Sequence, residues 1–514
     1  MPVTRRRFIE SAGIVLAAPA LSRAATRPHI THGVASGDVD TGSAVLWARA
    51  DRPARALVEV ATSDTFIDAR RLAPVDVLPQ HDFVMKRLVA DLPPGQEIFY
   101  RVVFEDLAGG PARSEPVIGR FRTAPDTRRS VRFAWSGDTA GQGWGIDPSR
   151  GGMQTYAEIA RHEPDFFLHS GDAIYADNPI APRRAMPDGG TWNNLVVEGV
   201  DKVAETVAEF RGRFKYNLND AHLLAMNARL PTVFAWSDHD VVDNWSDGTD
   251  PGADGRYSVR DIRLLAARAR HAFGEMTPVR LDPAALGRID RRIAYGPLLD
   301  LFVLDTRSHR GANGPSPEPE PGEPTRLLGA AQLDWLKDAL SRSTAAWKVI
   351  AVEQPLGVVV WNDWRTRRGV DAVANGDHGA PLGREHEIAD LLRFIHARGI
   401  DNVVWLTADV HYTAAHHYSP ERAAVGDFTP FWEFVSGPVH AGTFGPNELD
   451  MTFGPEVVFR KTPPPERGVN LPPSDGLQFF GIVDIDGESA RMTVRLMDRA
   501  GGELHRVELD PASY

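Results

Sequence analysis

The chain contains no cysteine among its 514 residues, which excludes disulfide bonds, thiolate metal ligands and cysteine nucleophiles. Basic residues are outnumbered, because 57 Lys and Arg stand against 69 Asp and Glu and the formal net charge is −12. A nucleic-acid-binding protein normally presents a basic face, so no nucleic-acid-binding patch is expected. No apolar run approaches the roughly 18 residues of a transmembrane helix, so no transmembrane segment is expected. With 42% hydrophobic and 25% charged residues the composition is that of a globular protein.

The N-terminus has the order of features found in an export signal. Thr4-Arg5-Arg6-Arg7-Phe8-Ile9 precedes a weakly apolar stretch from Ala12 to Ala20. Paired arginines before Phe8 are typical of a twin-arginine signal, although a disordered basic tail is the alternative. We expect residues 1–25 to be a signal peptide, the twin-arginine export machinery to be a partner, and the protein to be periplasmic or secreted.

Two parts of unequal size follow. Residues 29–125 contain strand-like runs near 43–48, 56–60 and 98–104 separated by turn signals, which predicts a small immunoglobulin- or fibronectin-like β-sandwich. Residues 130–514 alternate short apolar runs with amphipathic patterns, which indicates an α/β domain. The predicted helices lie near 153–162, 201–214, 258–273, 327–342 and 384–398.

Six apolar runs in the larger part end in polar, chemically capable side chains. The segments that follow them are Ser136-Gly137-Asp138; Ser170-Gly171-Asp172-Ala173-Ile174-Tyr175; Ser237-Asp238-His239-Asp240, with Asn244 shortly after; Asp305-Thr306-Arg307-Ser308-His309; Glu353-Gln354-Pro355; and Thr407-Ala408-Asp409-Val410-His411. In an open α/β sheet, ligands bind beyond the carboxyl ends of the strands. If these strands share one sheet and one direction, their polar tails meet at one edge.

Several carboxylates at one edge cannot all stay ionised without compensation, and two multivalent cations would supply it. Oxygen donors with one or two imidazoles suit Fe, Mn, Zn, Mg or Ca, and a tyrosine phenolate favours ferric iron. The candidate residues are Asp138, Asp172, Tyr175, Asp238, His239, Asp409 and His411. Each has a purely structural alternative, since a Gly-Asp after a strand is commonly a turn or a helix N-cap. The support for a metal centre comes from the repeated occurrence of such residues at strand ends, and no single motif is sufficient.

Other polar residues stay open between two interpretations. Asp305 and His309 form either a structural ion pair or part of the site, and Gln354 belongs either to the pocket or to the scaffold. His416, His417 and His440 either line the pocket or lie on the surface. The chain has no Walker sequence, no Gly-x-Ser-x-Gly motif and no His-x-His-x-Asp-His cluster, which argues against a P-loop NTPase, an α/β-hydrolase and a metallo-β-lactamase.

Five segments, taken in order, resemble the PhoD-like alkaline phosphatase D branch of the calcineurin-like metallophosphoesterases. They are His32-Gly33-Val34-Ala35-Ser36-Gly37-Asp38 with Val45-Leu46-Trp47-Ala48-Arg49; Ser170 to Asp177; Trp236 to Asn244; Leu304-Asp305-Thr306-Arg307; and Thr407 to His411. The resemblance implies an α/β fold over residues 130–514, a metallophosphoesterase-type β-sandwich flanked by helices (α/β/β/α), next to the smaller N-terminal all-β sandwich domain.

The resemblance also implies a site. Asp172 would bridge two metals. Tyr175, Asp138 and His411 would complete one, an iron-like site, while Asp238, Asp409 and Asn244 would serve the second. His239 would stabilise the transition state or the leaving group. The chain departs from better-known members in having no cysteine near Asp138, and in having Gln354 near the position of a further histidine ligand. The implied cofactors are two or more metal ions: Fe(III) with Ca, or another divalent metal such as Mn or Zn.

The sequence therefore predicts an exported, metal-dependent phosphoesterase that hydrolyses phosphate monoesters, with a small phosphoester as substrate. In this hypothesis a metal-bound hydroxide attacks phosphorus in line, and His239 assists the leaving group. Arg307 either contacts the phosphate as a fork donor or forms a surface ion pair. Two alternatives remain: a phosphodiesterase or phospholipase D-like activity on the same site, and a non-catalytic exported metal- or glycan-binding protein.

Overall fold

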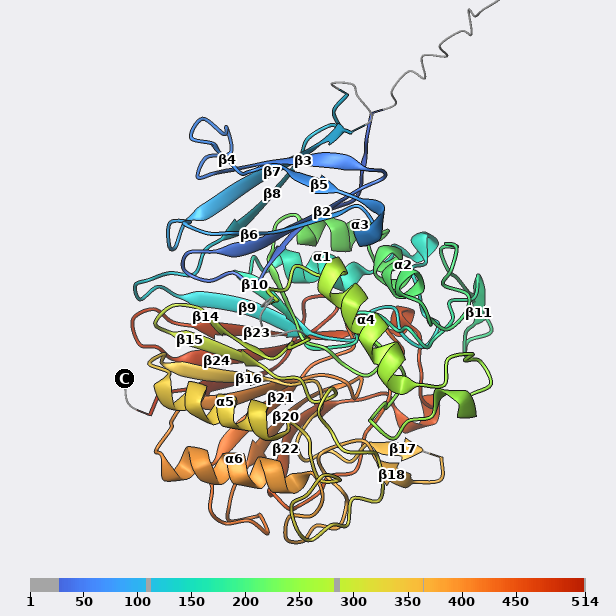
Figure 1. Cartoon of the computed structure of the whole chain (residues 1–514). Coiled ribbons are helices and arrows are strands. Elements are labelled where there is room, and N and C mark those ends of the chain that lie inside the picture. The colour runs from blue at the N-terminus through green and yellow to red at the C-terminus, as the bar shows by residue number, and fades with distance from the viewer. Residues whose placement is uncertain (1–26, 108–111, 282–286, 364, 513–514) are drawn as a thin grey trace, which may run out of the picture.

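The computed structural model describes residues 27–107, 112–281, 287–363 and 365–512 (Figure 1). The predicted signal segment, residues 1–25, lies outside the described residues. In the described part, the strands form sheets of nine, seven and five strands and two short hairpins. Within the same ranges, no helix has both the length and the apolar character that a bilayer span requires.

The N-terminal part has two β-layers. One contains β3 (Ala54–Ala61), β7 (Glu97–Asp106), β8 (Val117–Arg122), β4 (Arg70–Arg71) and β5 (Val75–Val77), and the other contains β1 (Ile30–Gly37), β2 (Ala44–Ala50) and β6 (Val84–Val89). Buried and partly exposed residues alternate along most of β7, as expected where one face of a strand covers a core. Leu46, Val58 and Tyr100 lie in the shared apolar core. The three predicted strand-like runs fall within β2, β3 and β7.

The second of these layers continues into the nine-stranded sheet, whose order is β25-β24-β23-β9-β10-β13-β1-β2-β6. The further strands are β9 (Val131–Ser136), β10 (Phe166–His169), β13 (Thr232–Phe234), β23 (Phe479–Ile485), β24 (Met492–Asp498) and β25 (Glu503–Leu509). β1 joins β13 through one parallel pair, Gly37 with Thr232. A Cβ at Gly37 would lie 2.4 Å from the Thr232 carbonyl oxygen, so only glycine allows this junction.

The seven-stranded sheet has the order β14-β15-β16-β19-β21-β20-β22. Its strands are β14 (Arg291–Ala294), β15 (Leu299–Val303), β16 (Trp347–Ala351), β19 (Val403–Thr407), β20 (Thr413–Tyr418), β21 (Phe431–Val435) and β22 (Pro455–Lys461). The six strands that end in chemically capable side chains do not share one sheet, so the condition stated for a single edge is not met. β9, β10 and β13 run parallel in the nine-stranded sheet, and β15, β16 and β19 run parallel in this one. The two sheets face each other across one core, because Phe133 and Leu168 of the first pack with Val349 of the second.

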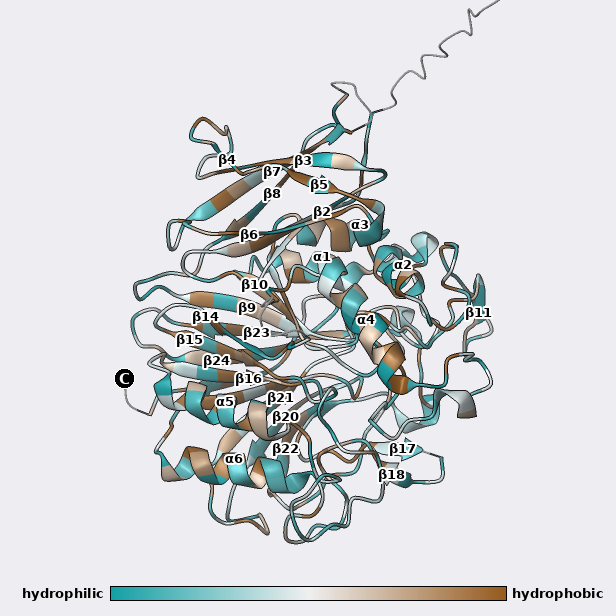
Figure 2. Cartoon of the chain, viewed as in Figure 1, coloured by the Kyte–Doolittle hydropathy of each residue, from teal (hydrophilic) through white to brown (hydrophobic). Residues whose placement is uncertain are grey.

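Helices cover the outer faces of this sandwich (Figure 1). They are α1 (Gln154–Arg161), α2 (Val207–Asn217), α3 (Ala221–Asn227), α4 (Ile262–Met276), α5 (Ala330–Arg342) and α6 (Glu385–Ala397). α6 buries Ile388, Leu391, Leu392 and Ile395, the three- and four-residue spacing of one helix face. Figure 2 shows this alternation of apolar and polar residues along α5 and α6. The layer order is therefore helix, sheet, sheet, helix.

All five predicted helices are present, with differences at their ends. α2 begins at Val207 rather than near residue 201, because Thr206 and Glu209 form a reciprocal capping box at its start. α3 was not predicted, since its seven residues are too few to show a helical period. Two small hairpins complete the described strands: β11 (Arg183–Ala185) with β12 (Thr191–Asn193), and β17 (Trp361–Asp363) with β18 (Arg368–Val370).

Candidate metal centre

The ends of the two sets of parallel strands bring distant acidic and imidazole side chains together. Three groups each place one ligand atom per residue within 4.8 Å of the others. The groups are Asp138, Asp172 and His411; Asp172, Asp238 and His239; and Asp238, Glu353 and Asp409. Asp172 belongs to the first two and Asp238 to the last two, so the donors form one continuous row.

The backbone at these positions is unusual. Asp138, Asp172, Asn244, Asp409 and His411 all have positive φ, at 68°, 51°, 54°, 64° and 59°. Most non-glycine residues avoid this left-handed region, and Asn, Asp and His are the side chains that enter it most readily. Strained residues of this kind cluster at functional sites, where the surrounding structure holds them in place. Each strand thus ends in a sharp turn that points a polar side chain into the row.

The first group has a ready metal ligand in His411. Nδ1 of His411 is hydrogen-bonded to the Gly442 carbonyl oxygen, which assigns the proton to Nδ1 and leaves the lone pair on Nε2. That Nε2 lies 2.8 Å from the Tyr175 hydroxyl and 3.5 Å from Oδ1 of Asp138. Burial lowers the pKa of His411 to about 4, so the imidazole is neutral and able to bind a cation.

Asp138 shows the strongest sign of a missing partner. Its Oδ2 is buried and has no hydrogen-bond donor among the described residues. A Cβ at Gly437 would lie 2.3 Å from this oxygen, so the glycine makes room for it. A buried carboxylate oxygen without a donor is costly, and a bound cation would satisfy it.

His239 stands over the middle of the row. Its backbone N–H donates to Oδ1 of Asp172 at 3.2 Å, and its Nδ1 lies 2.8 Å from Oδ1 of Asp177. Its Nε2 is 3.4 Å from Oδ1 of the more exposed Asp243, and its ring lies 4.3 Å from that of Tyr175. Burial alone would lower the pKa of His239, but the surrounding carboxylates raise it well above its ordinary value.

Arg307 is entirely buried beside the third group, so the surface ion pair considered for it is wrong. It donates to both oxygens of Asp371, at 2.8 and 2.9 Å, and its Nε lies 2.5 Å from Oε1 of Glu353. Its Nη2 is 3.7 Å from Asp238 and 4.0 Å from Asp409. Burial would raise the pKa of Asp238, but the Arg307 guanidinium holds it below its usual value.

The remaining carboxylates of the row are poorly compensated. Burial, followed by neighbouring charges that include the Asp238 carboxylate, raises the pKa values of Asp138, Asp172 and Asp409 well above 3.8. The two buried arginines, Arg307 and Arg310, cannot neutralise so many acidic groups. The shared Asp172, the orphaned oxygen of Asp138 and the mixed oxygen and nitrogen donors fit two metal ions held side by side.

The backbone N–H of Asn244 donates to Oδ2 of Asp238 at 2.7 Å, which places this residue beside the second group. Three residues of the site were not singled out from the sequence: Glu353, Asp177 and Asp371. Glu353 directly follows a strand like the other candidates, and Asp177 stands two residues after Tyr175, so both carried a local signal. Asp371 had no such local signal. It follows the short strand β18, and only the tertiary structure brings it into contact with Arg307.

The residues left open earlier lie outside the row. Asp305 accepts the backbone N–H groups of Arg307 and Ser308, while His309 is exposed, and no ion pair joins Asp305 to His309 within the described ranges. Gln354 is buried against Asp371 and Arg310, which makes it scaffold. His416 is buried against Glu433, and His417 packs on the Trp432 ring. The His440 ring is hydrogen-bonded to the Gly145 carbonyl, and its backbone N–H donates to the Asp138 carbonyl.

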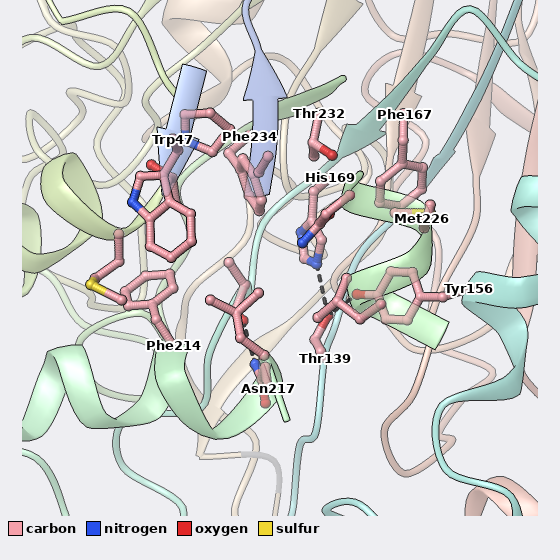
Figure 3. A pocket seen from close by; sticks show the side chains of 18 residues that line it. Trp47, Thr139, Tyr156, Phe167, His169, Phe214, Asn217, Met226, Thr232 and Phe234 are labelled. Carbon is pink, nitrogen blue, oxygen red and sulfur yellow. Dashed lines mark hydrogen bonds between the residues drawn. The ribbon is translucent and has the colours of Figure 1, made fainter. Parts of the chain in front are cut away.

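A small cavity of about 50 Å³ is lined by Thr139, the residue after Asp138, and by none of the candidate ligands (Figure 3). Thr139 borders it, and its hydroxyl lies 2.7 Å from Nε2 of His169 and 2.6 Å from the Tyr156 hydroxyl. The Thr139 N–H donates to the Asp172 carbonyl at 2.9 Å. The cavity wall thus ties the turn of Asp138 to the turn of Asp172, and we regard it as support for the site.

Comparison with known proteins points to one family. The model of the PhoD-like phosphatase family matches residues 133–496, and the model of the PhoD-like phosphatase N-terminal domain matches residues 16–125. Alkaline phosphatase D of Bacillus subtilis (strain 168) is 28% identical over 455 residues, which cover 84% of this chain and 72% of that protein.

Solved structures show the same fold. A structure of PhoD aligns with a TM-score of 0.67 at 22% identity, covering 95% of this chain and 90% of the other. The purple acid phosphatase PPD1 from yellow lupin (Lupinus luteus) seeds aligns with a TM-score of 0.58 at 12% identity, covering 94% and 74%. The predicted metallophosphoesterase-type sandwich flanked by helices is therefore confirmed.

Proposed function

The chain belongs to the PhoD-like phosphatase family and is a hydrolase of phosphoric ester bonds, and we propose that it hydrolyses phosphate monoesters at a two-metal centre. The observation that carries the proposal is the position of Asp172, which is shared between two adjoining groups of ligand atoms. A shared carboxylate is what holds two cations at the roughly 3.5–4 Å spacing of two-metal phosphoesterases.

The first ion would be held by Asp138, Tyr175 and His411 together with Asp172. A phenolate and an imidazole among carboxylates favour Fe(III) at this position. The second ion would be held by Asp172, Asp238, Asp409 and Asn244, and Glu353 adjoins this group. Mostly oxygen donors there favour Ca, with Mn or Zn as alternatives.

The bound ions would supply charge neutralisation for the phosphoryl oxygens and a lower pKa for a coordinated water. The chain's own residues position and exchange protons around them. His239 is held at Nδ1 by Asp177, and its Nε2, beside the exposed Asp243, serves as proton donor to the leaving group. Arg307 does not act as a free fork for phosphate, because both its Nη atoms donate to Asp371 and its Nε is ion-paired with Glu353. It is a positioning residue that orients the carboxylates of the second group.

Export through the twin-arginine pathway to the periplasm or outside the cell remains part of this proposal, and the arginines at positions 5–7 support it. The partners proposed are a small phosphoester substrate and the export machinery. A monoester dianion suits a site with two cations and a protonated His239 better than a diester monoanion does, which favours the phosphatase over a phosphodiesterase or phospholipase D-like enzyme.

The test compares rates on phenyl phosphate and diphenyl phosphate with protein whose metal content is measured by elemental analysis. We expect about two metal ions per chain and a clear preference for the monoester. Asp172→Asn should lose metal and lower kcat by more than the ~10–100-fold typical of disturbing an outer partner of a ligand. Asp188→Asn, an exposed turn residue, is the matched control. Full metal content and rate in Asp172→Asn would contradict the two-metal assignment, and faster cleavage of diphenyl phosphate would favour the diesterase.

A further inference from the structure

Arg184 on β11 is a half-buried arginine without an acidic partner. In the described part of the chain, no carboxylate oxygen lies within ion-pair distance of its guanidinium, whereas Arg150 near it is paired with Asp147. Burial lowers the pKa of Arg184 from its ordinary value, and no charged group offsets that effect. Charged side chains that leave water are normally paired, so Arg184 is available to pair with an anion from outside the chain.

Arg184 is held in place by an aromatic platform. Its guanidinium stacks on the buried Trp144 ring, with Cζ 4.0 Å from the ring centroid. Trp144 in turn donates to Oδ1 of Asn470 at 2.8 Å and meets Trp192 edge-on at 5.7 Å. Trp192 donates to the Gly145 carbonyl at 3.1 Å. The platform is fixed at both rings, so the cation it carries is oriented before any ligand arrives.

The platform adjoins the first metal group through the glycine-rich loop 141–145. Gly143 has φ of +79°, and a Cβ there would lie 2.6 Å from Nη1 of Arg184, while a Cβ at Gly141 would lie 2.4 Å from the Tyr175 ring. Between them, the Gln142 side chain accepts the Gly442 N–H at 3.2 Å, and the Gly442 carbonyl accepts from His411. Only Gln142 thus lies between the glycine that adjoins Arg184 and the glycine that adjoins Tyr175, a candidate ligand of the centre.

We propose that Arg184 binds a second anionic group of the substrate, so that the site prefers phosphate esters whose organic part carries another phosphate or carboxylate. This inference rests on the proposed phosphatase function. A guanidinium recognises phosphate and carboxylate through two parallel hydrogen bonds, and a face of Arg184 that is not stacked on Trp144 remains for that purpose. Esters with a second anionic group would bind more tightly than esters without one, because only they supply an acidic partner for the Arg184 guanidinium.

The competing explanation is that the stack on Trp144 is the whole role of Arg184. A cation–π contact contributes about 0.5–2 kcal/mol to stability, and its loss would lower the unfolding temperature without changing which ligand binds. The two explanations therefore differ in ligand discrimination rather than in stability.

The experiment measures binding of non-hydrolysable probes to the metal-loaded protein by calorimetry. The probes are phenylphosphonate, which has one anionic group, and two longer relatives with a second one, benzene-1,4-bisphosphonate and biphenyl-4,4′-bisphosphonate. The wild type should bind at least one bisphosphonate more tightly than phenylphosphonate. Arg184→Gln should weaken that bisphosphonate about tenfold, the scale of a hydrogen bond to a charged group, and change phenylphosphonate less than twofold.

Arg183→Gln is the matched control, because it removes the same charge from the adjacent, exposed position, whose side chain points to the opposite face of the strand. It should leave the preference for the bisphosphonate intact. If Arg184→Gln folds poorly, Arg184→Lys, which keeps the charge and gives up the flat stack, should weaken the bisphosphonate only about threefold.

The inference would be overturned if the Arg184 variants kept the wild-type ratio of bisphosphonate affinity to phenylphosphonate affinity for both bisphosphonates. An equal loss of affinity for all three probes would also overturn it. Hydrolysis of phenyl phosphate is measured in parallel. Failure of the wild type to hydrolyse it would defeat the proposed function, while the bisphosphonate ratio would still decide the role of Arg184.

Discussion

The hydroxyl of Tyr175 lies 2.8 Å from Nε2 of His411, although 236 positions separate the two residues in the chain. Tyr175 follows β10 in the nine-stranded sheet, and His411 follows β19 in the seven-stranded sheet. Their contact therefore crosses the sandwich and joins the two sheets at the centre. These two potential ligands are a neutral imidazole and a phenol. When a cation binds between them, each would exchange its hydrogen bond to the other for a bond to the cation.

The first prediction concerns that phenol. Tyr175→Phe removes one oxygen donor and keeps the ring packed against His239. We expect the iron content and the phosphatase rate to fall, and a visible absorption band from phenolate bound to Fe(III) to disappear. Tyr100→Phe, which removes a buried hydroxyl in the N-terminal sandwich, should change neither iron content nor colour. An unchanged spectrum in Tyr175→Phe would remove the phenol from the ligand set.

The second prediction separates the two nitrogens of His239. Asp177→Asn weakens the hold on Nδ1, and we expect kcat to fall about 10–100-fold because the ring loses its orientation. Asp243→Asn affects the partner of Nε2, a side chain that is 60% exposed, and should change kcat less than about threefold, since solvent screens that pair. Metal content should stay constant in both variants. Equal effects of the two substitutions would mean that Nδ1 is not the anchored atom.

The third prediction concerns the buried Arg307. Arg307→Gln removes one of the two buried arginines that pair with Glu353 and Asp371 and leaves Arg310 as the other. Removal of one partner of a buried ion pair typically costs about 3–5 kcal/mol. Urea unfolding of the metal-loaded protein should show a lower free energy of unfolding. Arg55→Gln breaks an exposed pair with Asp76 and should leave the urea midpoint unchanged. A wild-type midpoint in Arg307→Gln would show that other groups already compensate these carboxylates.

The fourth prediction concerns metal removal. Dialysis against a chelator should lower the thermal midpoint, because the carboxylates of the row then repel one another. The pKa values of Asp138, Asp172 and Asp409 are raised above 3.8 in the folded chain without metal, so the folded state holds more protons than the unfolded state. Stability of the metal-free protein should therefore fall as pH rises above about 4.

Addition of Fe(III) or a divalent ion should restore the thermal midpoint and flatten this pH dependence. Thermal unfolding followed at several pH values, with and without chelator, checks both statements. A metal-free protein as stable as the loaded one at pH 8 would show that the row does not depend on cations for its charge balance.

Local sequence was sufficient for much of the secondary structure. The apolar spacing of α6 predicted its face and nearly its ends, because Gly399, with φ of 58°, follows its C-cap and stops the helix. The same reasoning placed α2 six residues too early, since hydrophobic periodicity continues before the helix and only the Thr206–Glu209 capping box marks the true start. Helix α3 escaped prediction because two turns contain too few apolar positions to define a period.

The candidate site was predictable in its parts, because short apolar runs that end in Asp, His or Tyr are visible in the chain itself. Arg307 shows the limit of this reasoning. Its sequence neighbours are compatible with an exposed ion pair, yet Asp371, 64 positions further along the chain, joins it in a buried network. Charge pairing between distant segments leaves no trace in local composition.

What the sequence alone determined was the kind of chemistry: no thiols, an excess of carboxylates, and six strands that each end in a potential ligand or its neighbour. What only the tertiary structure decided was the grouping. It divided those strands between two facing sheets, joined Tyr175 to His411 and Asp172 to Asp238, and left Arg184 without an acidic partner among the described residues. The physical reason is that burial of apolar strand faces is a local property of the sequence, whereas the distance between two charges depends on how the whole chain is folded.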